Sequence, residues 1–416
     1  METEYKWFLG IDSGFTKHQV CLLDAHGPLI EEKIIDHTGD GLSVLLLWLK
    51  RVVGDRFSEL AVSLESPHGA VVEVLLDHGA AVFALNPKQL DRFRDRFTVA
   101  GAKDDRRDAY VLAASMRTDL TAFRRLDPPN AFTVRLRELS RTLDDVTRDL
   151  RRWSNQLYDL LVRYFPAVLQ LSPAADDPWV WDLLELATLP AAAARMTEEH
   201  IALILKRYRI RRFTAAQVCA VLRQEALPLA SSSTESCAEH VLLLLPVLRC
   251  LHAQRKQIVH TMSELMENVV SCPEDPNYAT VCSMLSIPGI GIQTATTLLA
   301  EAGHLLAAKD RAGLRAYSGV APVTKQSGKS KRVHMRRGCN QRVREACYHW
   351  ARVCVQRDHQ TRLHYRKLRD AGHGHARALR GVCDRLLSVL VSMLRTNQMY
   401  DPERQRCANL AVGQPA

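Results

Sequence analysis

Over roughly the first 120 residues, short hydrophobic runs alternate with stretches of helical spacing. Three strand-like segments come first, separated by Gly-containing turns: WFLGID, HQVCLLD and LIEEKIID. A helical stretch, a fourth strand (ELAVSLE), a helix from about Gly69, a fifth strand (AAVFALN) and helices from Lys88 onward follow. This order predicts an α/β domain over residues 1–125.

Residues 130–272 carry the pattern of long helices. Apolar residues from Phe132 to Tyr164 recur at a 4-3-4-3 spacing, and a second seam runs from about Glu239 to Val269. An Ala-rich helical stretch between them ends in a Ser-rich linker, ASSSTESCAE. The seams predict a coiled coil, paired as an antiparallel hairpin within one chain or between chains. A plain helical spacer fits the same spacing as well as an oligomerisation arm does.

Residues 273–400 predict a mostly helical C-terminal domain, and residues 401–416 a disordered tail. The domain opens with SMLSIPGIGIQTATTLLAEAG, which resembles a helix-hairpin-helix element. Gly289 and Gly291 permit a tight turn, and the backbone N–H groups that open the next helix form a seat for phosphate. A glycine turn between two purely structural helices has the same pattern.

Charge separates the two ends of the chain. The formal net charge is +10, yet residues 309–385 hold 20 Lys and Arg against 5 Asp and Glu, whereas residues 1–100 hold 10 basic and 15 acidic residues. A basic surface of this kind predicts contact with a polyanion. The candidate nucleic-acid contacts are Gly289, Gly291, Lys325, Lys329, Lys331, Arg332, Arg336, Arg337, Arg342 and Arg344.

Composition excludes several other classes of protein. With 47% hydrophobic and 25% charged residues the chain is typical of folded proteins, not disordered ones. The 11 cysteines form no Cys-x-x-Cys pair, which argues against a disulfide framework or a zinc ribbon. The acidic N-terminus is unlike a signal peptide, and the apolar run Val241–Leu245 is too short to span a bilayer. We therefore expect a cytoplasmic protein with no membrane partner.

Four carboxylates stand at informative positions in the α/β domain. Asp12 ends the first predicted strand, Glu65 ends the fourth, and Asp105 and Asp108 are three residues apart on a predicted helix. A meander of three strands followed by alternating helix and strand is the order of a ribonuclease-H-like (RuvC-like) sheet, in which these acids could converge on Mg²⁺ or Mn²⁺. Turn-forming acids and a solvated helix face are the alternative.

Ser327 lies in the basic loop between Gln326 and Gly328. A hydroxyl in electropositive surroundings can act as a nucleophile, although most serines in such Ser/Gly/Lys loops are linker residues.

Together these motifs resemble the DEDD insertion-sequence transposases, also called bridge-RNA-guided recombinases, of the insertion sequence one-ten and eleven-eleven groups. GIDSGFTKH, AVSLES and AKDDRRDAYVLA would supply Asp12, Glu65, Asp105 and Asp108 as catalytic acids and metal ligands. IPGIGIQTATTLLAEAG, YSGVAPVTKQSGKSKR and RRGCNQRVREA follow the order of the family's C-terminal domain, and Ser327 matches its serine. Two departures matter: Asp104 precedes Asp105, so the ligand could be shifted by one, and Ser318 and Ser330 are nearby alternatives to Ser327.

The resemblance implies a RuvC-like nuclease domain, a coiled coil and a serine-bearing domain in a prokaryotic protein that works at the nucleoid. It implies a tetramer, a dimer of dimers, and a guide (bridge) RNA that pairs with donor and target DNA. It further implies Mg²⁺ at the four acids and a covalent phosphoserine formed by Ser327.

Three other functions are weighed against this one. A RuvC-like structure-selective nuclease needs only the acids and the basic surface, and its product carries no attached protein. An actin-like sugar kinase shares GIDSGFT, but the second half of the chain reads as helical and basic. A non-catalytic RNA-binding scaffold would lack metal-dependent cleavage.

Overall fold

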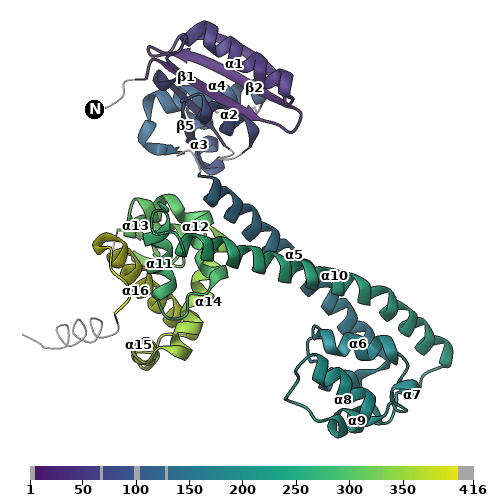
Figure 1. Cartoon of the computed structure of the whole chain (residues 1–416). Coiled ribbons are helices and arrows are strands. Elements are labelled where there is room, and N and C mark those ends of the chain that lie inside the picture. The colour runs from purple at the N-terminus through teal and green to yellow at the C-terminus, as the bar shows by residue number, and fades with distance from the viewer. Residues whose placement is uncertain (1–4, 66–68, 98–103, 127–129, 329, 402–416) are drawn as a thin grey trace, which may run out of the picture. The chain divides into compact units, whose positions relative to one another are not determined.

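The computed structural model describes residues 5–65, 69–97, 104–126, 130–328 and 330–401. It divides into two compact units, Met1–Asn130 and Ala131–Ala416, and each is described here by itself (Figure 1). Lys329 and nearly all of the predicted tail, residues 402–416, lie outside the described residues.

The first unit is built on a six-stranded sheet with the strand order β3-β2-β1-β4-β5-β6. The strands are β1 (Trp7–Ser13), β2 (Lys17–Asp24), β3 (Leu29–Asp36), β4 (Leu60–Leu64), β5 (Ala81–Ala84) and β6 (Arg124–Arg125). β1, β2 and β3 form an antiparallel meander, β4 runs parallel to β1, and β5 runs parallel to β4. The edge strand β6 escaped sequence prediction because two arginines carry no alternating pattern.

Helices cover both faces of this sheet. Leu9 and Ile11 of β1 share a buried cluster with α1 (Gly39–Val53) and α2 (Ala70–Asp77). Phe8 points to the opposite face, where the cluster includes α3 (Pro87–Phe97) and α4 (Asp105–Thr118). Two short 3-10 turns, η1 (Phe57–Glu59) and η2 (Leu120–Ala122), complete the unit. The predicted α/β character is confirmed.

Gly10 fixes how closely α4 lies on β1. A Cβ at this position would stand 1.9 Å from the backbone oxygen of Ala109 and 2.6 Å from the backbone nitrogen of Ala113. No side chain fits such a gap, so the glycine allows the helix backbone to rest directly on the strand.

The second unit is mostly helical, as the sequence predicts. Its elements are α5 (Ala131–Tyr164), η3 (Pro166–Gln170), α6 (Pro178–Leu186), α7 (Pro190–Ala193), α8 (Glu198–Arg207), α9 (Ala215–Leu222), α10 (Ser231–Val270), α11 (Tyr278–Ser286), α12 (Ile292–Ala307), α13 (Arg311–Tyr317), β7 (Val323–Ser327), β8 (Ser330–His334), α14 (Gln341–Arg357), α15 (His359–Asp370) and α16 (His375–Thr396).

The two long helices α5 and α10 form an antiparallel hairpin within the chain (Figure 1). Leu136, near the start of α5, shares a buried cluster with Met266 at the end of α10. Leu157 at the other end of α5 shares a second cluster with Val241 near the start of α10. Each end of the hairpin therefore carries its own core, one with α6, α8 and α9 and one with α11 to α16.

The sequence predicts a Ser-rich linker here. This prediction is wrong for Ser231–Glu239, because these residues form the first turns of α10. Cys237 and Ala238 are buried in the core of α6 to α9, and this packing outweighs the weak helix propensity of the serines.

α10 is the one helix in the described part of the chain that is long and apolar enough to cross a membrane, by length and composition alone. Its apolar residues include Val241, Leu244 and Leu248, which are buried against the neighbouring helices. The core helix of a globular protein passes the same test.

Candidate functional site

Asp12 and Glu65 lie on neighbouring strands at the same edge of the first sheet. β1 and β4 are parallel, and Ile11 pairs with Leu64, so the next residues in register are Asp12 and Glu65. Side chains alternate along a strand, and since Ile11 and Leu64 face α1 and α2, the two carboxylates belong to the face that α4 covers.

The first turn of α4 lies at this same edge. At the other end of the helix, Arg117 donates from Nη1 to the backbone oxygen of Ala25 at 3.4 Å. Ala25 follows Asp24, which pairs with Trp7 at the start of β1. Because the last turn of α4 stands at the start of β1, its first turn, with Asp105 and Asp108, stands at the end of β1 that carries Asp12.

Asp104 has a structural role that separates it from Asp105. It is the N-cap of α4, and its Oδ1 accepts a hydrogen bond of 2.7 Å from the backbone N–H of Arg107. Asp105 is exposed in the first helical turn. A capping aspartate satisfies a helix N–H that otherwise lacks a partner. The register that assigns Asp105 rather than Asp104 as a ligand stays a prediction, and the cap supports it.

Asp108 is buried and is already paired with a cationic side chain, that of Arg94. Only 3% of the residue is exposed. Arg94 of α3 donates from Nε to Oδ1 at 2.7 Å and from Nη2 to Oδ2 at 2.8 Å, a bidentate pair. The same guanidinium donates from Nη1 to Asp91 at 2.8 Å. Arg94 is not identified from the sequence alone. It lies 14 residues before Asp108 on a different helix, and no local pattern indicates their contact.

We call the end of the sheet with Asp12, Glu65, Asp105 and Asp108 the acid edge. Its carboxylates are suitable ligands for a divalent metal, but in the structure they are not close enough together to bind one. Carboxylate oxygens are the ligands that Mg²⁺ and Mn²⁺ prefer. Yet no group of three or more His, Cys, Asp or Glu side chains in the described ranges stands close enough to share an ion. The buried carboxylate of Asp108 shows where positive charge is needed, and Arg94 supplies it here. The four acids therefore fit a metal if the carboxylate of Asp108 separates from the guanidinium of Arg94.

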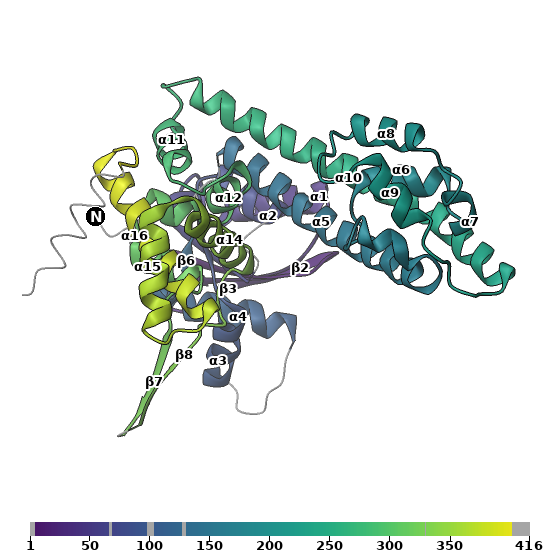
Figure 2. The same cartoon turned by 90° about the horizontal axis from the view of Figure 1, so that it is seen from below.

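The candidate serine lies at the end of an exposed hairpin in the second unit (Figure 2). Ser327 ends β7 and pairs with Ser330, which begins β8. Between them Gly328 has φ +54°, the left-handed conformation that two-residue hairpin turns favour. Ser327 and Ser330 are both exposed, whereas Ser318 is only 1% exposed at the end of α13. Burial thus argues against Ser318 as a nucleophile.

Lys325 and Arg332 share a face of this hairpin with the two serines. Lys325 pairs with Arg332 across the strands, two residues from the Ser327–Ser330 pair. Residues at this spacing point to the same side of a β-ribbon. Like charges placed directly opposite are destabilising unless an anion lies between or above them. The hairpin therefore presents hydroxyls beside a pair of cations.

The predicted basic contacts divide into two kinds. Lys325, Lys331, Arg332 and Arg337 are exposed, and their side chains make no hydrogen bond or ion pair with any residue that the structure describes. The other three described cations, Arg336, Arg342 and Arg344, are engaged within the unit.

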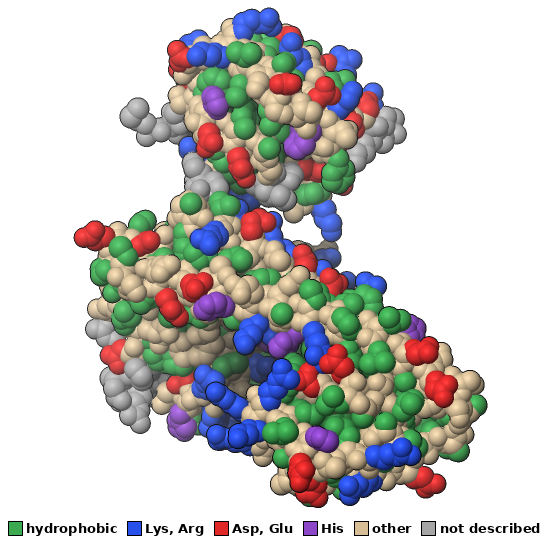
Figure 3. All heavy atoms as spheres, turned by 45° about the vertical axis from the view of Figure 1, so that its right-hand side comes forward, with side chains coloured by type: hydrophobic (Ala, Val, Ile, Leu, Met, Phe, Trp, Pro, Cys, Tyr) green, Lys and Arg blue, Asp and Glu red, His purple; other side chains and the backbone are tan. Residues whose placement is uncertain are grey.

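Arg342 Nε binds Asp144 of α5 at 2.7 Å, Arg336 Nε binds the Ala321 oxygen at 3.2 Å, and Arg344 binds the Arg336 oxygen and, from Nη1, Gln341 at 3.1 Å. These three support the fold of the basic region. In Figure 3, Lys and Arg side chains gather around a hollow on one face of the larger unit.

The helix-hairpin-helix-like element consists of α11 and α12, but Gly289 serves packing. Its φ is +82°, and a Cβ there would stand 2.9 Å from the backbone nitrogen of Cys354 in α14. The Trp350 indole donates to the adjacent Pro288 oxygen at 3.3 Å. Gly291, by contrast, is the N-cap of α12 and has open space around it. Of the two glycines, Gly291 has the surroundings that a phosphate contact needs.

Comparison with known proteins gives a consistent result along the chain. Residues 9–166 match a family model described as a transposase of the DEDD type from IS110 elements, and residues 283–366 match the model of the IS116/IS110/IS902 transposase family. Both the acid edge and the serine hairpin fall within the matched ranges.

The mini-circle protein for IS117 from Streptomyces coelicolor, named a candidate transposase, is 30% identical over 409 residues, which cover 95% of this chain and 96% of the relative. An IS110 insertion-element protein from the same species is 28% identical over 412 residues, or 97% of this chain and 98% of the relative. A candidate transposase from Sinorhizobium fredii is 44% identical over 209 residues, but the aligned part spans only 58% of that relative. Because the similarity to the IS117 protein extends over nearly the whole of both sequences, the chain belongs to the IS110 family of insertion-sequence transposases.

Proposed function

We propose that this protein is an RNA-guided DNA recombinase of an insertion sequence, which cleaves and rejoins strands through a covalent phosphoserine intermediate. The observation that carries the proposal is the presence on one chain of an acid edge and of an exposed serine beside unpaired cations. A hydrolytic nuclease needs the first of these features only.

The sheet supports a ribonuclease-H-like (RuvC-like) assignment for the first unit. Its order, with an antiparallel meander beside parallel β4 and β5, is that expected of such a sheet. Asp12, Glu65, Asp105 and Asp108 would hold Mg²⁺ or Mn²⁺ at the edge where β1 and β4 end. When bound, the metal would stabilise the charge that develops on the transferring phosphate.

The reaction at the serine exchanges one phosphate ester bond for another and therefore needs no ATP. Ser327 Oγ attacks the phosphorus of a DNA phosphodiester, its proton passes to water, and the bond from phosphorus to the 3′ oxygen breaks. The 3′ oxygen leaves and takes up a proton, while the 5′ phosphate stays on the serine. Lys325 and Arg332, on the same face of the hairpin, would stabilise the developing negative charge. A 3′-hydroxyl from another strand then attacks the phosphoserine and releases Ser327.

Partners follow from the same proposal. The unpaired cations Lys325, Lys331, Arg332 and Arg337 are suited to phosphates, which position nucleic acid without reading sequence. A guide RNA would therefore choose the donor and target DNA by base pairing. We further propose a homotetramer in the cytoplasm of a prokaryote, acting at the nucleoid, with the acid edge of one subunit serving the serine of another.

The experiment is electrophoresis of DNA labelled on the 3′ side of the cleavage point, under denaturing conditions with Mg²⁺. Wild-type protein should shift the label into a protein-linked band, and peptide mapping should find the phosphate on Ser327. Ser327→Ala should abolish the band, whereas the matched Ser330→Ala should keep it. Cleavage by wild-type protein without any adduct would favour the RuvC-like hydrolase instead.

A further inference from the structure

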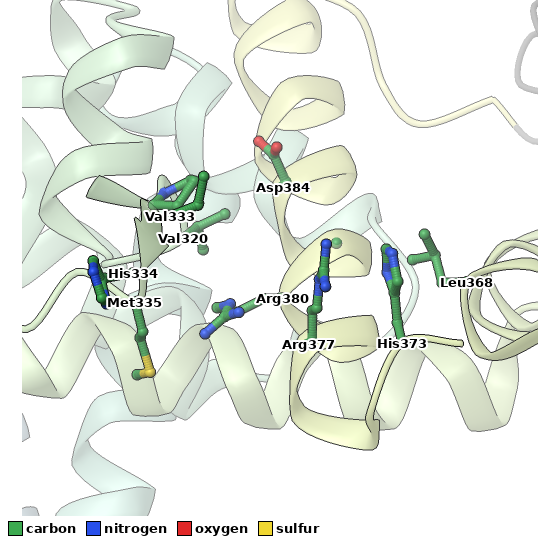
Figure 4. Close-up of a pocket in the computed structure, with 11 residues that line it drawn as sticks. Val320, Val333, His334, Met335, Leu368, His373, Arg377, Arg380 and Asp384 are labelled. Atoms are coloured by element: carbon green, nitrogen blue, oxygen red, sulfur yellow. The ribbon is translucent and has the colours of Figure 1, made fainter. Parts of the chain in front are cut away.

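A hollow of about 310 Å³ lies at the base of the serine hairpin (Figure 4). Its walls come from four parts of the second unit. These are the segment around Val320 that precedes the hairpin, the end of β8 with Met335 just after it, α15 and the following loop with Leu368 and His373, and α16 with Arg377 and Arg380. This volume is at the small end of the range for ligand pockets, so it suits one small group rather than a helix or a duplex.

The hollow carries positive charge that nothing in the described chain neutralises. Arg377 and Arg380 line it, and their guanidinium groups form no hydrogen bond or ion pair with any described residue. In Figure 4 the Arg380 side chain extends from α16 toward Met335, and Arg377 runs beside His373. The one acid of the lining, Asp384, is bound on both oxygens by Arg315, at 2.6 Å and 2.9 Å. The site therefore favours an anion.

Apart from His334 and His373, the remaining side chains of the wall are apolar, and a bare anion would not use them. Val333 and Met335 line the hollow and keep 61% and 49% of their surface exposed. Leu368 closes the back against α16, where a Cβ on Gly381 would stand 2.7 Å from Leu368 Cδ1. Exposed apolar side chains beside unpaired guanidinium groups fit a ligand with both an apolar face and a negative charge.

The hollow continues the cationic face of the hairpin. Arg332, which pairs with Lys325, is followed along β8 by Val333 and His334, and both of these line the hollow. A nucleic-acid strand whose phosphates contact Lys325 and Arg332 would thus reach the hollow within a few nucleotides.

We propose that this hollow holds one unpaired nucleotide of the bound nucleic acid. Arg377 and Arg380 would bind its phosphate, and the base would rest on the apolar wall and on the guanidinium or imidazole planes, as unstacked bases do in other proteins. The inference rests on the proposed nucleic-acid-binding function and adds a preference for a bulged or single-stranded residue. An acidic peptide would use the arginines but gains less from the flat apolar wall.

Binding of two duplexes that differ by one bulged nucleotide tests the inference, in a DNA arm and an RNA arm. Wild-type protein should bind the bulged duplex about tenfold more tightly than the fully paired one, as expected when one base gains a stacking site. A 2-aminopurine at the bulge should change its fluorescence on binding. The arm that shows the preference identifies the source of the nucleotide.

Variants separate the hollow from the general basic surface. Arg377→Gln with Arg380→Gln should abolish the bulge preference, and Met335→Gln, a neutral polar change at an exposed position, should reduce it without changing the charge of the hollow. The matched control Arg337→Gln, an exposed cation that does not line the hollow, should weaken both duplexes equally.

Equal binding of both duplexes by wild-type protein in both arms, or a preference that survives the double variant, would overturn the inference. Failure to bind any nucleic acid would overturn the proposed function itself.

Discussion

Arg94 occupies both carboxylate oxygens of Asp108, at 2.7 Å and 2.8 Å, where metal coordination would require at least one of them. The two side chains are only 12% and 4% exposed, so this is a buried pair. A buried carboxylate needs a cation, and two candidates, the guanidinium and the metal, would compete for it.

We expect Arg94→Met to lower the free energy of unfolding of the metal-free protein by about 3 kcal/mol, because Asp108 then stays buried without a partner. Added Mg²⁺ should recover more stability in this variant than in the wild type, since the ion replaces the missing charge. Thermal unfolding with and without Mg²⁺ measures both effects. Equal Mg²⁺ stabilisation in the two proteins would show that Arg94 and metal do not share Asp108.

The same pair changes how Asp108 should be tested as a catalytic acid. Asp12→Ala, Glu65→Ala and Asp105→Ala should each abolish strand cleavage while RNA binding persists. Asp108→Ala would also remove the buried partner of Arg94 and leave its guanidinium with Asp91 alone, so Asp108→Asn, which keeps the shape, is the better variant. Cleavage assays together with circular dichroism distinguish loss of chemistry from loss of fold.

Asp104 and Asp105 should fail in different ways. Asp104→Ala removes the N-cap of α4 and should cost about 1 kcal/mol of stability, whereas Asp104→Ser should restore most of it. Asp105→Ala should leave stability unchanged and abolish cleavage. Urea unfolding and cleavage are measured on the same preparations. An inactive Asp104→Ser with an active Asp105→Ala would shift the proposed ligand by one residue.

The hairpin cations should set the salt dependence of nucleic-acid binding. Lys325→Gln and Arg332→Gln should each reduce the slope of log affinity against log salt by about 1, because each removes one phosphate contact. Arg342→Gln should instead lower stability, since Arg342 binds Asp144 of α5. Fluorescence anisotropy over a salt series, with an unfolding curve for each variant, provides the comparison. An unchanged slope for both hairpin variants would place the phosphate contacts elsewhere.

The elements that the sequence predicts well are those with a local period. The short hydrophobic runs of β1 and β2 and the seam of α5 are patterns among residues close together in the sequence, and the structure has these elements in place. The pairing of Arg94 with Asp108 and the hollow below the hairpin depend on contacts between distant segments, which no local pattern encodes. Gly289 shows the same limit, because its turn is visible in the sequence while its contact with Cys354 is not.

Glu301 in α12 joins the long hairpin to the serine-bearing region. Its Oε1 accepts from Arg141 of α5 at 3.1 Å, and its Oε2 accepts from Asn340 at 3.0 Å, just before α14. Burial alone would raise the pKa of Glu301, but the hydrogen bonds and charges of Arg141 and its neighbours outweigh burial and hold that pKa below the ordinary value.

A carboxylate with a lowered pKa in the folded state stabilises the fold above its unfolded pKa, about 4.3 for glutamate, and this stabilisation is lost as the pH falls through the folded pKa. Glu301→Gln should therefore lower the free energy of unfolding by about 2 kcal/mol near pH 7, because a hydrogen bond to a charged group is lost. The difference from wild type should shrink as the pH falls below about 4. The exposed acid Glu345 supplies the control, since Glu345→Gln should show no such pH dependence. Urea unfolding across this pH range measures the effect, and a constant difference between Glu301→Gln and wild type would mean that the charge of Glu301 does not stabilise the fold.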